Sequence, residues 1–389
     1  MQNEWFTRPR RIAGVMTGTS LDAVDVAFAD FSLEDGRPRM RSVRGFSSPF
    51  SEEERRGLQS LIRQPQRIGV VNDYNVWLSH RIASVVRAGC DEMGIAPSSL
   101  DAVGMHGQTV WHEPAEHTVH GIPLRSTLQI GSIPTLAVMV GTTVVGDFRS
   151  ADVALGGQGA PLVPRFDADF LKDDGQEVIA LNIGGMANVT LLPRGCSDHH
   201  VRAFDTGPGN VWIDHAMEQW FGKRYDDNGG CAREGTLHRE LFERLCAIDF
   251  VTAPPPKSTG RETFSAERID DLVSSCSSKP TPCDAVHTIT AFTAWSIAEN
   301  VRRYGWEDAR IVVSGGGLRN AFLMERLGRE LPAARIMSAD SAGIPAEWKE
   351  CLCFAYLAYR TLGGLPSNLP SVTGASRSTI LGVVGYPGT

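Results

Sequence analysis

The sequence predicts an α/β protein made of two lobes. Its 389 residues are enough for two domains of ordinary size. Short apolar runs typical of buried strands alternate with longer runs at helical spacing, and glycine turns separate them. Both halves also begin with a strand, a turn of small residues and a second strand, over 12–28 and again over 178–192. The two units are too different in sequence to count as a repeat, so we expect one supersecondary arrangement used twice.

In the first half, the apolar run Ile12–Met16 predicts a buried strand, Thr17–Ser20 a tight turn, and Asp25–Phe28 the return strand. Apolar residues near helical spacing over 67–93 predict a long amphipathic helix. The remaining elements expected here are strands at 100–105 and 142–145, a helix at 133–140 and a loop at 156–161.

In the second half, Val178–Ile183 predicts a strand, Gly184-Gly185 a turn, and Asn188–Leu192 the return strand. A further strand is expected to end at Phe204, directly before Asp205. The other elements expected are helices at 286–304, 320–331 and 350–362, and a strand at 311–313 that precedes a glycine turn.

Composition and charge exclude several classes of protein. Apolar residues make up 42% and charged residues 21%, which is typical of a globular chain and not of a disordered one. The net charge of -7 provides no general attraction to nucleic acid or to an anionic membrane. No apolar run reaches the length of a membrane span, residues 1–11 lack the apolar segment of a secretion signal, and the eight cysteines form no C-x-x-C pair. We therefore expect a cytoplasmic protein without membrane or nucleic-acid partners.

The first turn is a candidate phosphate site. Gly18, Thr19 and Ser20 offer backbone N–H groups and hydroxyls to phosphate oxygens. Asp22 and Asp25 follow at once, and carboxylates can hold Mg²⁺ directly or through water. An ordinary hairpin turn is an equally good interpretation of this segment alone.

Two further turns resemble nucleotide contacts. Gly184-Gly185 with Asn188 is the second, and the three glycines at 315–317, followed by Asn320, are the third. The third turn suits contact with a base or ribose and places a helix N-terminus nearby, although Asn320 is also an ordinary helix cap. The chain contains no G-x-x-x-x-G-K-[ST] motif and no G-x-G-x-x-G after its first strand, so neither a P-loop nor a dinucleotide fold is expected.

Asp205 is the candidate general base. It is expected at a strand end, before Gly207-Pro208-Gly209, where a carboxylate has little freedom and can accept a proton. An isolated aspartate in this context more often caps a turn.

Polar residues after other strands suit a sugar-like ligand. They occur at 106–109 and 147–149, and a basic loop at 257–261 is either an anion contact or a surface turn. His106 and His112 match no common zinc spacing. Cys351 and Cys353 lie in an apolar helical pattern and are expected in the core.

Eight short motifs, in consistent order between about Ile12 and Gly385, resemble the anhydro-N-acetylmuramic acid kinase family. They are Met16–Asp22, His106–Pro114, Gly146–Arg149, Gly156–Pro164, Asn182–Gly185, Phe204–Asn210, Pro256–Glu262 and Val372–Ala375. Two positions depart from the family pattern. Thr17 replaces the usual serine and keeps a hydroxyl, whereas Ala23 replaces glycine and adds a methyl group where phosphate is expected to approach.

The resemblance implies a two-lobed actin/hexokinase-like (ribonuclease H-like) fold with a nucleotide and sugar cleft between the lobes. The N-terminal lobe is then expected at 1–150, with 375–389 returning to it, and the C-terminal lobe at 151–374. The implied reaction uses ATP and Mg²⁺ to open the 1,6-anhydro ring of anhydro-N-acetylmuramic acid with water and to phosphorylate O6, giving N-acetylmuramic acid 6-phosphate in peptidoglycan recycling. A homodimer is also implied. Levoglucosan kinases are similar and remain the alternative.

The resemblance also assigns the site residues. The catalytic residue is Asp205, and the metal ligands are Asp22 and Asp25. The ATP-binding residues are Gly18, Thr19, Ser20, Leu21, Asp22, Ala23, Val24, Asp25, Gly184, Gly185, Asn188, Gly315, Gly316, Gly317 and Asn320. The substrate-binding residues are His106, Gln108, Thr109, Arg149, Gln158 and Glu350. Arg149 and the 257–261 loop are further candidates for contacts to the lactyl carboxylate. A regulator without catalysis is disfavoured because the base and the sugar loops are present, and an ATP hydrolase would be recognised by ATP turnover without sugar.

Overall fold

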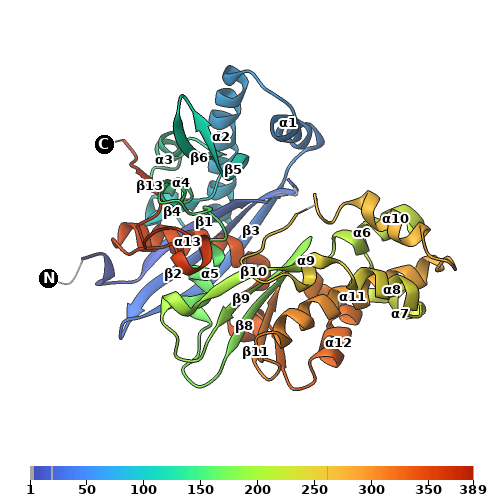
Figure 1. Cartoon of the computed structure of the whole chain (residues 1–389). Coiled ribbons are helices and arrows are strands. Elements are labelled where there is room, and N and C mark those ends of the chain that lie inside the picture. The colour runs from blue at the N-terminus through green and yellow to red at the C-terminus, as the bar shows by residue number, and fades with distance from the viewer. Residues whose placement is uncertain (1–3, 19–20, 261, 389) are drawn as a thin grey trace. The chain divides into compact units, whose positions relative to one another are not determined.

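The structure, a computed structural model, describes residues 4–18, 21–260 and 262–388 and contains two compact α/β units (Figure 1). Unit 1 consists of Met1–Phe170 and Trp348–Thr389, and unit 2 of Leu171–Glu347. The expected lobe boundaries therefore differ from the observed ones, because residues 151–170 and 348–374 belong to unit 1. The reason is packing: α5 (Val163–Phe170) contacts α13 (Lys349–Leu362), and α13 covers the sheet of unit 1.

Unit 1 is built on a six-stranded sheet with the order β13-β7-β4-β1-β2-β3. β1 pairs antiparallel with β2 and parallel with β4, and the β2–β3 pair is antiparallel. The strands are β1 (Arg10–Thr17), β2 (Ala23–Glu34), β3 (Arg37–Pro49), β4 (Ala102–Met105), β7 (Val144–Gly146) and β13 (Val383–Gly385). A separate hairpin of β5 (Gln108–Val119) and β6 (Ile122–Ile130) occupies a region where polar loops were expected.

Two glycines let α13 lie directly on the sheet. A Cβ at Gly14 would lie 1.8 Å from the carbonyl oxygen of Cys351, and one at Gly104 would lie 2.1 Å from that of Phe354. Only glycine permits so close an approach of helix and strand backbones. Cys351 and Cys353 are buried in this layer, as the sequence predicts.

Helices cover both faces of the unit 1 sheet. Side chains alternate along a strand, so Ala13 and Val15 face away from α13 and into a core with α2 (Ile68–Glu92) and α3 (Ile133–Val140). A capping box at Ser51 starts α1, because Ser51 and Glu54 satisfy each other's backbone N–H groups. Besides α5 and α13, the helices are α1 (Glu52–Arg63), α2 (Ile68–Glu92), α3 (Ile133–Val140), α4 (Ser150–Ala154) and α14 (Pro370–Thr373), with short 3-10 turns at Glu4–Phe6 and Pro97–Ser99.

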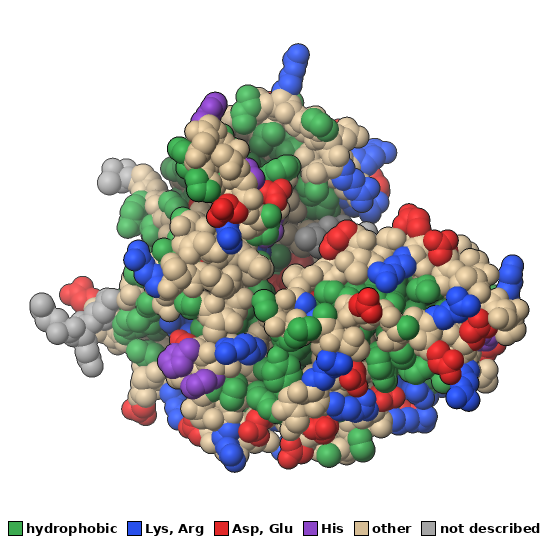
Figure 2. Space-filling view, viewed as in Figure 1, with side chains coloured by type: hydrophobic (Ala, Val, Ile, Leu, Met, Phe, Trp, Pro, Cys, Tyr) green, Lys and Arg blue, Asp and Glu red, His purple; other side chains and the backbone are tan. Residues whose placement is uncertain are grey.

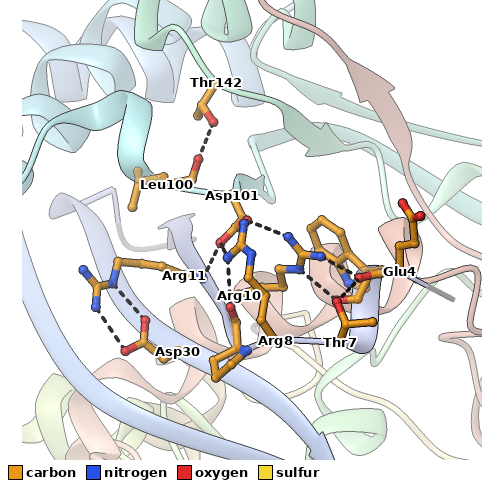
Figure 3. A network of polar contacts seen from close by, with 11 residues as sticks. Glu4, Thr7, Arg8, Arg10, Arg11, Asp30, Leu100, Asp101 and Thr142 are labelled. Atoms are coloured by element: carbon orange, nitrogen blue, oxygen red, sulfur yellow. Dashed lines mark hydrogen bonds and ion pairs between the residues drawn. The ribbon is translucent and has the colours of Figure 1, made fainter. Parts of the chain in front are cut away.

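Charged contacts anchor the start of β1 (Figure 3). Asp101 accepts a hydrogen bond from the backbone N–H of Arg11 at 2.9 Å and forms ion pairs with Arg8 and Arg10. Arg11 in turn pairs with Asp30 on β2 at 2.8 Å. These contacts fix the register of the strand whose other end leads into the Gly18 turn.

Unit 2 repeats the sheet arrangement of unit 1. Its order is β10-β9-β8-β11-β12, again with two antiparallel pairs beside the first strand and parallel pairs beyond it. The strands are β8 (Val178–Ile183), β9 (Met186–Leu192), β10 (Arg202–Pro208), β11 (Arg310–Ser314) and β12 (Arg335–Ser338). This shared order confirms the predicted two-lobed, ribonuclease H-like α/β class.

The helices of unit 2 pack around α11 (Pro282–Arg302), which begins directly after the cap residue Thr281, four residues earlier than the sequence pattern predicts. The others are α6 (Val211–Phe221), α7 (Gly230–Glu234), α8 (Arg239–Cys246), α9 (Asp249–Thr252), α10 (Ala266–Ser274) and α12 (Ala321–Glu330). Short 3-10 turns lie at Asp198–His200, Asp227–Gly229, Gly316–Arg319, Asp340–Ala342 and Ala346–Trp348.

On the face shown in Figure 2, Lys and Arg side chains are interspersed with Asp and Glu. None of the helices in the described part of the chain combines the length and the apolar character that a bilayer span requires.

Candidate functional site

The Gly18 turn joins β1 to β2 in unit 1. The backbone N–H of Leu21 donates to the carbonyl of Gly18 at 3.1 Å, and Leu21 has a φ of +56° although it is not a glycine. Its side chain is buried, which holds the residue in this conformation. A bulky residue in the left-handed region is strained, and such strain clusters at ligand sites. Thr19 and Ser20 lie outside the described residues.

The acidic residues after this turn differ in exposure. Asp22 is exposed, Ala23 and Asp25 are half-buried, and Val24 is fully buried in the core, so Val24 can contact a nucleotide only through its backbone. Asp25 accepts a hydrogen bond from Ser47 Oγ at 2.6 Å.

The carboxylates fit a Mg²⁺ ion of the kind that is shared with phosphates. Among the described residues there is no group of three or more protein ligands for a metal. Mg²⁺ needs only one or two carboxylates when phosphate and water complete its octahedron. Asp25 also helps to raise the pKa of Glu350, so negative charge accumulates here that a cation would neutralise.

His106 and Arg149 form the polar centre of unit 1. Nε and Nη2 of Arg149 lie 3.1 and 2.7 Å from Nε2 of His106, and Nη1 donates to the carbonyl of Gly159 at 2.7 Å. The other imidazole nitrogen, Nδ1, lies 2.7 Å from the carbonyl of Gly107, and the ring packs on Phe354. Burial, with the nearby Arg149 charge, lowers the pKa of His106 to about 3, and burial lowers that of Arg149 to about 10. At neutral pH the imidazole is therefore neutral and the guanidinium is charged.

Glu350 lies in the first turn of α13. Desolvation by the surrounding protein raises the pKa of its carboxyl, and the negative charge of Asp25 acts in the same direction. The positive charges of Lys349 and Arg149 act in the opposite direction. Its side chain nevertheless remains exposed. Beside it, the buried Lys349 ammonium pairs with Asp167 at 2.7 Å, which fixes the start of the helix.

Three further residues predicted to bind the sugar, Gln108, Gln158 and Thr109, differ in their exposure and in their hydrogen-bond partners. Gln108 is 2% exposed, and no described residue bonds its amide oxygen. A buried acceptor without a partner is costly, so this oxygen is available to a ligand donor. Gln158 is exposed, and its backbone N–H donates to the carbonyl of Thr373 at 2.8 Å. Thr109 is half-buried on β5.

Asp205 lies on β10 of unit 2. Its Oδ2 accepts a hydrogen bond from the backbone N–H of Thr259 at 2.7 Å and another from Ser258 Oγ at 3.1 Å. Within the described chain, no residue donates to Oδ1. Burial raises the pKa of Asp205 above its ordinary value, although these hydrogen bonds and the Lys257 charge act in the opposite direction.

One expectation about this region is wrong. The strand does not end at Phe204: β10 continues through Asp205 to Pro208, with a bulge between Asp205 and Gly207 that interrupts the pairing with β9. Bulges re-aim side chains at functional sites. For the 257–261 loop the sequence left two interpretations open. The ammonium of Lys257 is held within unit 2, because it donates to the carbonyls of Phe250 and Val251 at 3.0 and 2.8 Å, and Arg261 lies outside the described residues. The pKa of Lys257 is lowered to about 8 by burial.

The glycine turns of unit 2 lie against one another. The N–H groups of Gly209 and Asn210 donate to the carbonyls of Gly185 and Gly184, each at 2.8 Å. A Cβ at Gly315 would lie 2.6 Å from both Asn182 Oδ1 and the carbonyl oxygen of Ile183. Backbone therefore lines this part of unit 2, as a phosphate or ribose contact requires.

The remaining nucleotide candidates of unit 2 lie around these turns. Gly316 and Gly317 form a 3-10 turn, and Asn188 is paired with Asp205 across the sheet. Asn320 is a helix cap, because its side chain accepts a hydrogen bond from the N–H of Leu323 at 2.9 Å. The structure thus gives Asn320 the ordinary role that the sequence left open.

Each unit thus brings a subset of the predicted residues together. In unit 1 these are His106, Arg149 and the Gln158 loop, with Glu350 close enough to interact electrostatically with Arg149; in unit 2 they are the glycine turns. Sequence reasoning missed Asp152, whose only signal is its position three residues after Arg149.

Solved structures similar to this chain include an activator of 2-hydroxyisocaproyl-CoA dehydratase from Clostridium difficile with bound ADPNP. It shares 12% identity over 91% of this chain and 96% of that chain, with a TM-score of 0.44. A ROK family glucokinase from Streptomyces griseus, in complex with glucose and AMPPNP, shares 13% identity over 89% of this chain and 98% of that chain, with a TM-score of 0.38.

The family whose model matches is described as anhydro-N-acetylmuramic acid kinase, and the match spans residues 10–387. This is nearly the whole sequence and includes every predicted site residue. The chain therefore belongs to the anhydro-N-acetylmuramic acid kinase family.

Proposed function

We propose that the protein opens the 1,6-anhydro ring of anhydro-N-acetylmuramic acid with water and transfers the γ-phosphoryl group of ATP to O6. The product is N-acetylmuramic acid 6-phosphate, an intermediate of peptidoglycan recycling. Family membership supports this proposal, and the observation that carries it is the arrangement of Asp205.

Asp205 acts as the general base. Thr259 and Ser258 hold its Oδ2, so the carboxylate has a fixed orientation and Oδ1 remains available to a water molecule. The raised pKa makes the carboxylate a stronger proton acceptor than an ordinary aspartate. The water gives a proton to Asp205 and forms a bond to C1 of the sugar, while the C1–O6 bond breaks through an oxocarbenium-like state.

The freed O6 is the nucleophile for phosphoryl transfer. O6 would be a poor leaving group from C1 if it departed as a free alkoxide. Here it instead forms a bond to the γ-phosphorus of ATP, while the bond between that phosphorus and ADP breaks. Phosphoryl transfer depends mainly on positioning and on neutralising charge. We assign the positioning to the Gly18 turn. Mg²⁺, held by Asp22 and Asp25, would supply neutralisation of the phosphate charge.

The sugar contacts are assigned to unit 1. The amide oxygen of Gln108, to which none of the described residues donates, accepts a hydrogen bond from a sugar hydroxyl or N–H group. Arg149 is charged and half-buried, so it suits the lactyl carboxylate that distinguishes anhydro-N-acetylmuramic acid from levoglucosan. Its neutral partner His106 keeps the guanidinium in place without cancelling its charge.

Comparison of the two anhydro sugars tests the proposal. Purified protein is incubated with ATP, Mg²⁺ and either anhydro-N-acetylmuramic acid or levoglucosan, and the products are identified by mass spectrometry and ³¹P NMR. We expect the muramic acid sugar to gain one water and one phosphoryl group on O6, with ADP formed in equal amount. Faster turnover of levoglucosan would establish the alternative sugar, and ADP formation without any sugar product would contradict the kinase assignment.

A further inference from the structure

Asp152 is a fully buried carboxylate in α4 of unit 1 that the sequence did not identify. Its Oδ2 accepts a hydrogen bond from the N–H of Gly159 at 2.8 Å. Its Oδ1 accepts one from Asn368 Nδ2 at 2.8 Å and one from Thr373 Oγ1 at 2.7 Å. None of the ion pairs of the described residues includes Asp152, so neutral donors alone hold this carboxylate.

These donors belong to two segments that are far apart in the sequence. Gly159 lies in the 156–161 loop, whereas Asn368 precedes α14 and Thr373 is its last residue, more than two hundred residues later. The two segments also bond directly, because the N–H of Gln158 donates to the carbonyl of Thr373 at 2.8 Å. Asp152 is therefore the common acceptor that holds the loop against the α14 segment.

The loop has little freedom to adopt another position. A Cβ at Gly157 would lie 2.2 Å from Asp152 Oδ2, so only glycine fits beside the carboxylate. Gly159 has a φ of +68°, and a Cβ there would lie 2.8 Å from Val153. Both positions therefore require glycine, because the loop packs closely on Asp152 and Val153 of α4.

The same loop carries groups that we assign to the sugar. Gln158 lies between the two constrained glycines, with its side chain exposed. The carbonyl of Gly159 accepts the hydrogen bond from Arg149 Nη1 at 2.7 Å. Displacement of the loop would consequently move Gln158 and break the hydrogen bond between Arg149 Nη1 and the carbonyl of Gly159.

We propose that Asp152 is a positioning residue for the sugar substrate, which it serves by holding the 156–161 loop, and through it Gln158 and Arg149, against the segment at 368–373. The inference rests on the proposed assignment of these two side chains to the sugar. A carboxylate is needed because it is acceptor-only and can take all three hydrogen bonds, whereas an amide would direct an NH₂ group at one of the donors.

The test uses matched substitutions at Thr373, because Asp152→Asn buries an unpaired donor and is at risk of not folding. Thr373→Val removes the hydroxyl that donates to Asp152 at nearly constant volume, and Thr373→Ser keeps it. Hydrogen exchange of the 157–159 amides is measured without ligands, and KM is measured separately for anhydro-N-acetylmuramic acid and for ATP. We expect faster exchange and a sugar KM about fivefold higher in Thr373→Val, as for one lost hydrogen bond. The ATP KM should not change, and Thr373→Ser should behave like the unmodified protein.

The proposal is overturned if Thr373→Val and Thr373→Ser are indistinguishable, or if sugar and ATP KM rise together, which would indicate a general loss of structure. An unmodified protein that does not turn over the sugar would refute the proposed function instead. In that case the exchange rates still decide whether the hydroxyl of Thr373, through Asp152, holds the loop.

Discussion

Arg149 donates hydrogen bonds to Nε2 of His106 from two of its nitrogens, at 3.1 and 2.7 Å. Arginine has no acceptor, so Nε2 must accept, and the proton of the imidazole lies on Nδ1, which faces the carbonyl of Gly107. This pair therefore requires a neutral histidine, in agreement with the low pKa of His106. If His106 were protonated, both its Nε2 and the Arg149 guanidinium would be hydrogen-bond donors, and two positive charges would lie in contact without an acceptor between them.

The first prediction concerns stability at acidic pH. The pKa of His106 is about 3 in the folded protein, against 6.5 ordinarily, so the unfolded chain binds the proton more readily. The stability that neutral His106 provides is complete above about pH 6.5 and is lost as the pH falls toward 3. Its slope is at most about 1.4 kcal/mol per pH unit.

Urea unfolding between pH 7.5 and 5 measures this effect. His106→Gln keeps an acceptor for Arg149 but cannot titrate, so its free energy of unfolding should fall less steeply with acid than that of the unmodified protein. Parallel curves for the two proteins would show that His106 does not titrate as the structure requires.

The second prediction concerns the general base. Asp205→Asn removes the proton acceptor but retains an oxygen for Thr259 and Ser258, so the protein should fold. We expect kcat to fall by about 10²–10⁴-fold. Asp249→Asn, an exposed carboxylate in unit 2, is the matched control and should leave kcat unchanged. Near-normal turnover in a folded Asp205→Asn protein would exclude Asp205 as the base.

The third prediction concerns the glycine turn after β11. Gly315 has a φ of +86°, and a Cβ would collide with Asn182 and with the Ile183 carbonyl, whereas a Cβ at Gly316 would come no closer than 3.7 Å to Asn210. Gly315→Ala should therefore cost about 1–3 kcal/mol of unfolding free energy and raise the KM for ATP. Thermal unfolding of both alanine variants provides the comparison, and equal loss in Gly316→Ala would mean that strain is not the cause.

The fourth prediction concerns the guanidinium. Arg149→Lys keeps the charge but cannot bond His106 and the Gly159 carbonyl at the same time. We expect the KM for the sugar to rise about tenfold with little change in the KM for ATP. Arg329→Lys, on an exposed face of α12, serves as the control. An unchanged sugar KM in Arg149→Lys would remove Arg149 from the sugar site.

The strands of both central sheets were predictable where they are buried. Runs such as Val178–Leu181 are continuously apolar because both sheet faces are covered, and this pattern is easily recognised. By contrast, β3 is an edge strand rich in exposed arginines, and the β5–β6 hairpin is largely polar. Charged edges protect a sheet from aggregation but remove the hydrophobic signal on which the prediction depends.

Residues of the candidate site could be proposed from the sequence where a short local pattern identifies them. Gly315 and Asp205 follow recognisable turn patterns, although the bulge that orients Asp205 has no sequence signal of its own. The Lys349–Asp167 pair and the Asp152 contacts could not be predicted, because they join segments about 180 to 220 residues apart that only the fold brings together.

The coupled reaction is tested most directly by following the oxygen of water. Turnover of anhydro-N-acetylmuramic acid with ATP is run in ¹⁸O-enriched water, and the sugar phosphate is reduced at once with borohydride so that the C1 oxygen cannot exchange. We predict one ¹⁸O atom on C1 and none in the phosphoryl group. Label in the phosphate, or a product without label on C1, would contradict attack of water on the sugar and the role assigned to Asp205.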